Sequence, residues 1–401
     1  MKLKNKHILL IISFLFLLLS LHVSAASTVY LRLSPSEICR AGKYKFTFST
    51  VEETNTLYIR NGDENINSIP VASETCLTNG SLVFYISDIH YDSRLKITKY
   101  DIENSTTENL YTIKENKQCE LIDIIDSVLY FRIMELEGTE PGKLYAYDLE
   151  RNMVQTVSSN TIPCPVQKTA TIKEFLQTAL KPVGSTNYIW KGGHDDINST
   201  RIGLNPAWNT FFAEQDSSYK WKNTKYQFDD GLDCSGYVSW TLYNTLYSEK
   251  HKKSLLSLAK NMPSLYEAYG WGTIQSRESI TEYKAGDLMF CTDPSHICII
   301  LGKCKDNSVI LLHSSPPGVQ ISGTVTPDGK RNSEAVKLAA AYMKRYFPEW
   351  YQKYPKNSRN KSYLTDYNQF HWNLSEDGIF TDPDHLQGMT PEKVLEIIFE
   401  N

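Results

Sequence analysis

The second half of the chain has the clearest pattern of apolar and polar positions, and this pattern predicts a helix followed by three strands. After Asp233, apolar side chains recur at every third or fourth position, which is typical of a helix with one buried face. These positions are Tyr237, Val238, Leu242 and Leu246. A turn and short strand are expected over 285–290, residues 295–302 form an apolar strand, and residues 309–313 alternate and end on His313. This pattern favours an α+β fold.

The first half of the chain has strand patterns and a weak internal repeat. Residues 81–86 resemble residues 127–132, and Tyr100-Asp101 recurs as Tyr147-Asp148. Each unit predicts strand, turn and strand, as in one blade of a β-propeller. At most three units fit before residue 160, whereas a closed propeller needs about four or more. We therefore expect residues 26–160 to form an all-β domain with propeller-like repeats, as an open stack of β-meanders or a sandwich.

A chain of 401 residues is too long for one ordinary core, and the sequence supports a second domain. Residues 158–165 form a short proline-bearing linker, so the second domain is expected over 161–401. Within it, residues 194–229 are rich in aromatic and amide side chains without clear periodicity, which predicts a structured loop as an insertion. Residues 325–401 form a C-terminal extension with two expected helices, for which the sequence suggests packing on the sheet and no function.

The N-terminus predicts export. Lys2, Lys4 and Lys6 precede an apolar run over 8–21, and small residues at 23–25 suit a cleavage site, so residues 1–25 are expected to be a signal peptide. The run is short for a membrane span of about 20 residues. A secreted or cell-envelope protein with no stable membrane span after cleavage is therefore expected, with an uncleaved anchor as the alternative.

Charge and cysteine content narrow the possible partners. The chain has 42 basic and 46 acidic side chains, a balance that does not suggest nucleic-acid binding. Of its eight cysteines, four lie in the N-terminal part, where an oxidising compartment would permit disulfides that the sequence cannot assign. These four are Cys39, Cys76, Cys119 and Cys164. Cys291 and Cys298 lie in apolar strands and are expected to be buried core residues.

Cys234 is the best candidate for a nucleophile. It lies at the expected start of a helix, where free backbone N–H groups and the helix dipole lower the pKa of a thiol. His296 begins one strand and could act as the base, and His313 ends the next, where it could accept from or donate to the far ring nitrogen of that base. Each of these residues, taken alone, is more often a core side chain than a catalytic one, and Asp233 could simply cap the helix.

These residues occur within a series of motifs that resembles the NlpC/P60 family of papain-like cysteine peptidases. The motifs follow the family's order over about residues 171–322. They are Tyr188-Ile189-Trp190-Lys191-Gly192-Gly193, Asp233-Cys234-Ser235-Gly236, Ala285-Gly286-Asp287-Leu288, His296, and His313. Two departures are Cys298, where a small residue is usual, and the long connection that contains the insertion at 194–229.

The resemblance implies a papain-like catalytic domain, with helices packed on an antiparallel sheet, and a role for each motif residue. It implies Cys234 as the nucleophile, His296 as the base and His313 as the polar residue that orients it. It also implies that the Tyr188 hydroxyl lies near the oxyanion and that Trp190 contributes to substrate binding. Asp233 and Ser235 occupy positions that contact the free amine of the substrate in wall-peptide hydrolases of this family.

The expected function is therefore an exported cysteine peptidase that acts on peptidoglycan or muropeptides. The resemblance points to the bond between γ-D-glutamate and the diamino acid, and no metal or cofactor is expected. His194-Asp195-Asp196 offers possible metal ligands, but it has no partner motif at the spacing of a metal site. Two rivals remain: an N-acetylmuramoyl-L-alanine amidase like the related CHAP enzymes, and a non-catalytic wall-binding protein whose insertion fills the cleft.

Overall fold

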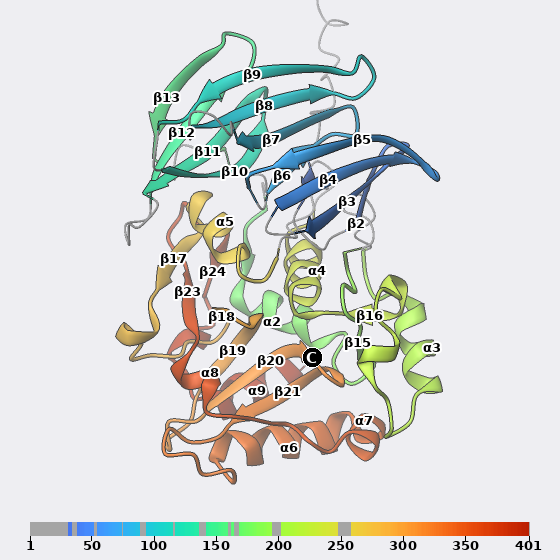
Figure 1. Cartoon of the computed structure of the whole chain (residues 1–401). Helices are drawn as coiled ribbons and strands as arrows, with labels where there is room; N and C mark the ends of the chain where they lie inside the picture. Colours follow the sequence, from blue (N-terminus) through green and yellow to red (C-terminus); the bar gives the residue numbers. More distant parts are fainter. Residues whose placement is uncertain are drawn as a thin grey trace, which may run out of the picture.

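The computed structural model shows a mixed α/β protein with several antiparallel sheets (Figure 1). It describes residues 31–33, 38–51, 54–73, 75–88, 94–114, 117–135, 142–158, 162–163, 168–194, 202–247 and 258–400. The expected signal peptide at 1–25 lies outside these residues. Among the helices of the described part, none has the length and apolar character needed to span a membrane.

The described N-terminal part forms three antiparallel sheets, in which neighbouring strands follow one another along the chain except that β1 pairs with β6. The first sheet contains β2 (Ile38–Ala41), β3 (Tyr44–Val51), β4 (Thr54–Asn61) and β5 (Glu64–Val71). The second contains β1 (Leu31–Leu33), β6 (Cys76–Thr78), β7 (Leu82–Asp88), β8 (Leu95–Asp101) and β9 (Thr106–Thr112). The third contains β10 (Lys117–Ile125), β11 (Val128–Glu135), β12 (Lys143–Asp148) and β13 (Met153–Val157).

The Tyr-Asp repeat has a structural cause. Asp101 ends β8 and Asp148 ends β12, and each carboxylate accepts hydrogen bonds from the backbone N–H groups two and three residues ahead. Such an aspartate turn closes the hairpin to the next strand. The preceding Tyr100 and Tyr147 are buried between sheets. The repeat therefore encodes a buried anchor followed by a turn.

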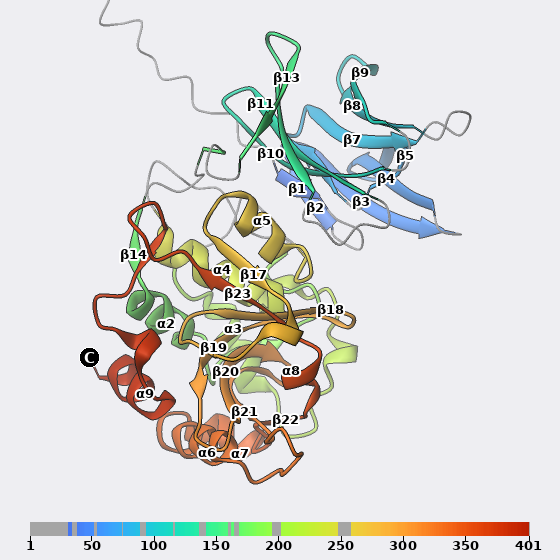
Figure 2. The ribbon, with the colours of Figure 1, turned by 90° about the vertical axis from the view of Figure 1, so that its left-hand side faces the viewer.

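The third sheet packs on the C-terminal part of the chain. Ile122, Tyr130 and Ala146 belong to the same apolar core as α2 (Ile172–Leu180) and α4 (Cys234–Leu246) of that part. Figure 2 shows β10 and β11 above α5 (Met262–Ala268). Beside this contact, the Tyr269 hydroxyl donates to Oδ2 of the buried Asp123 at 2.6 Å. The two parts are thus joined by apolar packing and a buried polar contact.

We expect Tyr269→Phe to weaken this junction. The substitution removes a hydrogen bond to a buried carboxylate, so the free energy of unfolding should fall by about 1–3 kcal/mol. Urea denaturation measures the change, and Tyr226→Phe is a matched control because Tyr226 is 49% exposed. Equal stabilities of the two variants would contradict a role for the Tyr269 hydroxyl at the junction.

The C-terminal part is built around a large sheet. Its strand order is β16-β15-β21-β20-β19-β18-β23-β17, with β22 paired to β21. The strands are β15 (Asn187–Tyr188), β16 (Gly231–Leu232), β17 (Gly272–Gln275), β18 (Leu288–Thr292), β19 (Ser295–Lys303), β20 (Val309–Ser315), β21 (Gly318–Thr324), β22 (Ser358–Arg359) and β23 (Asn368–Trp372). A parallel pair, β14 (Ala170–Thr171) and β24 (Phe380–Thr381), lies apart from it. The C-terminal extension contributes β22 and β23 to the sheet, so it is part of the fold.

Helices cover this sheet. They are α2 (Ile172–Leu180), α3 (Pro206–Glu214), α4 (Cys234–Leu246), α5, α6 (Glu334–Tyr346), α7 (Pro348–Lys353), α8 (Ser362–Thr365) and α9 (Pro391–Phe399), with short 3-10 turns η2 (Trp221–Asn223), η3 (Phe228–Asp230), η4 (Arg277–Ser279) and η5 (Leu386–Gly388). Capping side chains mark several starts, such as Thr171 at α2, Ser333 at α6 and Thr390 at α9. Figure 1 shows α6 and α7 beneath β20 and β21.

The expected loop at 194–229 is partly wrong, because the described part of it contains α3. Asn205 caps this helix by accepting from the Ala207 N–H, and Pro206 occupies its first turn. That pair is a recognised helix-start signal. Trp208 and Phe212 are the buried aromatic side chains of α3. The helix has only nine residues, which is too short for its apolar periodicity to be recognised in the sequence.

The central strands carry apolar side chains on both faces because both faces of the sheet are covered. Ile297, Ile299 and Leu301 of β19 belong to the core that contains α2 and α4. Cys298 and Ile300 belong to a smaller core on the other face, which also contains Tyr367 and packs Tyr363. Such two-sided burial produces a continuous apolar run instead of alternation.

The described cysteines carry free thiols. They are Cys76, Cys119, Cys234, Cys291, Cys298 and Cys304. Burial raises the pKa of the thiols of Cys76 and Cys119 above the usual range, as expected for inert core residues. Cys291 and Cys298 are buried as expected. The side chains of Cys39 and Cys164 lie outside what the structure describes, so a disulfide between these two is untested.

Candidate functional site

Cys234 is the first residue of α4, and it follows closely after β16 at the edge of the large sheet. Asp233 caps the helix by accepting from the Gly236 N–H at 2.7 Å. The glycines of the motifs allow a close approach here, since a Cβ on Gly236 would lie 2.1 Å from the carbonyl oxygen of Gly192. The thiol is consequently held with only 7% of the residue exposed.

The expected lowering of the thiol pKa is wrong for this structure. Burial, followed by the negative charge of Asp233, raises the pKa of Cys234 to about 12. The backbone N–H groups of Ile297, Ser235 and Cys234 itself act in the opposite direction, but they do not offset the burial. The helix start is present, yet desolvation has the larger effect.

This pKa predicts slow and strongly pH-dependent alkylation of Cys234. Only the thiolate reacts, so the rate with iodoacetamide should be low at pH 7 and should rise about tenfold per pH unit above it. The measurement belongs in a Cys304→Ser background, because Cys304 is the half-exposed thiol among the described cysteines. A rate that levels off below pH 8 would show that the thiol ionises much more readily than this.

The two histidines lie side by side on neighbouring strands. His296 is in β19 and His313 in β20, and their ring centroids are 5.9 Å apart at an interplanar angle of 76°. Each ring also has one buried nitrogen with no hydrogen-bond partner among the described residues, Nε2 of His296 and Nδ1 of His313. The structure thus brings the expected imidazole pair together, and one nitrogen of each ring is available for a further hydrogen bond.

The thiol is not hydrogen-bonded to this imidazole pair. Cys234 belongs to the core on the α4 face of the sheet, whereas alternation along the strands places the histidines with Cys298 and Leu311 on the other face. Within the described residues, no hydrogen bond joins the Cys234 thiol to either ring. Catalytic hydrogen bonds are often long in ligand-free proteins and form only when substrate binds.

The C-terminal extension covers the imidazoles with aromatic rings, which sequence reasoning missed. Tyr363 of α8 lies 5.8 Å from the ring centre of His296 and 6.2 Å from that of His313. Tyr367 stacks on Tyr363 at 4.6 Å and also contacts His296. No motif marks these tyrosines in the sequence, because their position depends on the return of the chain to the sheet at β22 and β23.

Arg359 of β22 is a second missed residue. Its Nε donates to Nε2 of His313 at 3.0 Å, and the Ser322 hydroxyl lies 3.0 Å from the same nitrogen. Because Nε2 accepts from Arg359, a neutral His313 carries its proton on Nδ1. Of the two roles that the sequence leaves open for His313, this bond favours donation toward His296.

Burial and Arg359 keep both imidazoles neutral. Burial, then the positive charge of Arg359, lowers the pKa of His296 to about 4, and the same causes lower the pKa of His313 well below its usual range. Asp233 acts in the opposite direction on His296. At neutral pH the site therefore holds a neutral thiol and two neutral imidazoles.

His194 occupies the position between the two residues expected to contact the substrate amine. Its Nε2 lies 3.1 Å from Oδ1 of Asp233 and 3.0 Å from Oγ of Ser235. Burial acts to raise the pKa of Asp233, but His194 and Lys191, with the Gly236 N–H, lower it. The sequence suggests His194 only as a possible metal ligand and does not predict its contact with Asp233. Its place directly after Gly192-Gly193 was the available signal.

Tyr188 lies in β15, and Trp190 follows it closely. β15 pairs with β16, the strand that leads into Cys234, with Tyr188 opposite Leu232. The hydroxyl of Tyr219 donates to the Tyr188 carbonyl at 2.6 Å. Burial, then Asp233 and Cys234, raises the pKa of Tyr188 above its usual range, so this hydroxyl stays protonated. Trp221 packs against Tyr188 and Trp190, with ring centres 5.6 Å and 6.0 Å away.

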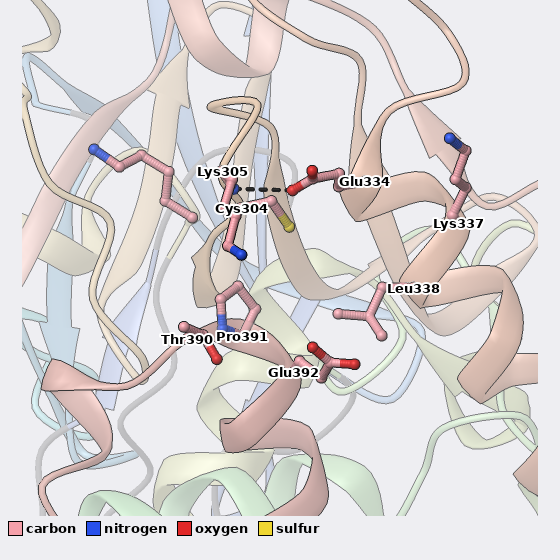
Figure 3. Close-up of a pocket in the computed structure, with 9 residues that line it drawn as sticks. Cys304, Lys305, Glu334, Lys337, Leu338, Thr390, Pro391 and Glu392 are labelled. Atoms are coloured by element: carbon pink, nitrogen blue, oxygen red, sulfur yellow. Dashed lines mark hydrogen bonds between the residues drawn. The ribbon is translucent and has the colours of Figure 1, made fainter.

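A separate pocket of about 520 Å³ lies between the turn after β19 and the starts of α6 and α9 (Figure 3). Its Cys304, with Asp306 and Glu334 nearby, offers three potential metal ligands. Both carboxylates already accept backbone N–H groups, Glu334 from Lys305 and Asp306 from Glu334. Because none of the expected site residues lines this pocket, we interpret the cluster as capping of the turn and of α6.

Comparisons with known proteins leave the family open. No protein-family model matches the chain, and no curated protein matches it. Among solved structures, the chain is similar to a neuraminidase-like protein from A/bat/Guatemala/164/2009, with 16% identity over 33% of this chain and 39% of that chain, at a TM-score of 0.21. It is also similar to a europium-containing methanol dehydrogenase, with 10% identity over 77% of this chain and 56% of that chain, at a TM-score of 0.24. The chain spans less than two thirds of each, and similarities this weak support no conclusion about fold or function.

Proposed function

We propose that this chain is a cysteine hydrolase with a papain-like catalytic unit that cleaves amide bonds in peptidoglycan peptides. The observation that carries the proposal is the convergence of a helix-start cysteine and an imidazole pair on the strands against which that helix packs. Cys234 begins α4, and His296 and His313 lie in β19 and β20. Their order along the chain is that of the NlpC/P60 motifs.

The proposed reaction proceeds through an acyl-enzyme. His296 takes the thiol proton as the sulfur of Cys234 attacks the amide carbonyl, and it then donates this proton to the departing amine. Water attacks the resulting thioester, which releases the acid and regenerates the thiol. Tyr188 suits the role of a hydrogen-bond donor to the oxyanion, because burial keeps its hydroxyl protonated.

The substrate assignment follows the sequence resemblance. The γ-D-glutamyl to diamino-acid bond of a stem peptide is the proposed target, and the expected signal peptide would bring the enzyme to the compartment that holds it. Incubation of purified muropeptides with the protein, followed by mass spectrometry, tests this directly. Fragments cut after D-glutamate support the endopeptidase, whereas release of the whole stem peptide would identify an N-acetylmuramoyl-L-alanine amidase.

One observation favours a non-catalytic wall-binding protein as the second candidate. The thiol is neutral and buried, and it makes no hydrogen bond to the imidazoles within the described residues. If binding is the function, muropeptides should bind without fragmentation, and a substrate-like thiol probe should leave Cys234 unlabelled in the folded protein. Fragmentation that depends on Cys234 would exclude this candidate.

A further inference from the structure

A basic pocket lies next to the imidazole pair. It has a volume of about 350 Å³ and is bounded by the end of β21, by β22 and by Tyr363. Its lining residues are Val325, Arg331, Lys356, Ser358, Arg359, Asn360 and Tyr363. Three of these side chains are cationic and none is acidic, so the lining is complementary to an anion.

Arg359 is a stronger indication of anion binding in this pocket than the net charge of the lining. Its Nη2 is buried and has no hydrogen-bond partner within the described part of the chain. The described residues also include no ion pair to this guanidinium, whose pKa is lowered by burial. A buried guanidinium with a free donor is costly unless an anion pairs with it, and carboxylates match its geometry with two parallel hydrogen bonds.

We propose that this basic pocket binds a carboxylate, and that Arg359 links the bound carboxylate to the His296 and His313 pair. Arg331 and Lys356 are exposed at the pocket and would attract the anion, while Arg359 would pair with it at the inner end. If the proposed hydrolase function holds, the ligand is a carboxylate of the peptide substrate. Tyr363 lines this pocket and also contacts both imidazoles, which places the ligand beside the imidazole pair.

The link operates through the charge of Arg359. Its Nε donates to Nε2 of His313, and its positive charge opposes protonation of the neighbouring His296. A carboxylate that pairs with the free Nη2 leaves the Nε bond in place and offsets this charge. Carboxylate binding therefore favours a protonated His296, which is the form that the proposed proton transfer from Cys234 produces.

The first experiment measures binding without turnover. In the full chain carrying Cys234→Ala, acetate at constant ionic strength should raise the thermal midpoint by about 2–4 °C relative to chloride. The double variant Arg331→Gln/Lys356→Gln should lose this shift. Lys305→Gln/Lys337→Gln is a matched control, because it removes two exposed positive charges at the other pocket (Figure 3) and should keep the shift. Equal shifts in all three proteins, or no shift in any, would overturn the carboxylate site.

The second experiment identifies the source of the carboxylate. Calorimetry with the Cys234→Ala protein compares a stem peptide bearing free carboxylates with the same peptide after amidation. We expect amidation to weaken binding at least tenfold, and to have little effect in the Arg331→Gln/Lys356→Gln background. Acetate binding without an effect of amidation would instead identify a free small acid as the ligand and overturn the substrate assignment. Neither measurement requires hydrolysis, so failure of the proposed function is detected separately.

The link between the basic pocket and Cys234 can be measured through the alkylation rate of the thiol. In Cys304→Ser protein at pH 7, acetate should accelerate alkylation of Cys234 several-fold, and Arg331→Gln/Lys356→Gln should abolish the acceleration. Acetate binding with an unchanged alkylation rate would show that the pocket and the thiol are not linked through Arg359.

Discussion

Cys234→Ala should abolish hydrolysis of muropeptides, with a loss of at least about a thousandfold in kcat/KM. Removal of a nucleophile leaves no path to the acyl-enzyme, and losses of this size or larger accompany such substitutions in hydrolases. Mass spectrometry of timed digests gives the rate, and intact-protein mass spectrometry should detect the acyl-enzyme in the unsubstituted protein only. The thermal midpoint should change by only a few degrees, because alanine removes one buried sulfur.

Cys298→Ala is the matched control for this experiment. Cys298 is likewise a buried thiol, but it lies in β19 and belongs to the core on the other face of the sheet. Its replacement should cost a similar amount of stability and leave kcat within a few-fold of the original. Hydrolysis that persists in Cys234→Ala would defeat the assignment of the nucleophile, whatever the result at Cys298.

His194→Ala is expected to have the largest effect on stability. The substitution leaves the buried Asp233 carboxylate without its imidazole partner, and loss of one member of a buried pair costs about 3–5 kcal/mol. The hydrogen bonds from Gly236 and Ser235 remain, so the lower end of this range is expected. Urea denaturation at pH 7 gives the difference, with His194→Gln as the control that keeps a donor.

The pH dependence of the free energy of unfolding distinguishes an electrostatic contribution of His194 from a packing contribution. The pKa of Asp233 in the folded protein lies below its ordinary value of 3.8, so its stabilising contribution is present above that value and is lost as the pH falls through the folded pKa. The stability difference between the original protein and His194→Ala should therefore narrow as the solution is acidified below pH 4. A difference that stays constant with pH would mean that the imidazole acts through packing alone.

Much of the fold could be predicted locally. The helix after Asp233 has a regular apolar spacing and a capping aspartate, and the helix from Pro391 has a capping threonine followed by proline. The repeated Tyr-Asp pair marked equivalent hairpins of the N-terminal part, because a turn and its buried anchor are encoded within a few residues. The α3 helix was missed although Asn205-Pro206 signalled its start, since the aromatic content of the segment obscured its periodicity.

The candidate site was predicted only in part. Motif order brought Cys234, His296 and His313 to attention, and the structure places the two imidazoles in contact. The local expectation of an acidic thiol was wrong, because the desolvation of Cys234 depends on the residues that pack around the helix start. Arg359 and Tyr363 lie far along the chain from the motifs, so no local pattern could connect them to the histidines.

Caps, turns and apolar periodicity act over a few neighbouring residues, so most helices and strands of this protein, and the residue types able to perform thiol chemistry, can be read from local sequence. The protonation of those residues and the partners that surround them depend on the folded chain. Burial keeps the thiol neutral, and burial together with the charge of Arg359 keeps the imidazoles neutral. His194 lies within hydrogen-bond distance of Asp233. Desolvation and ion pairing depend on distances between segments far apart in the chain, which only the folded arrangement fixes.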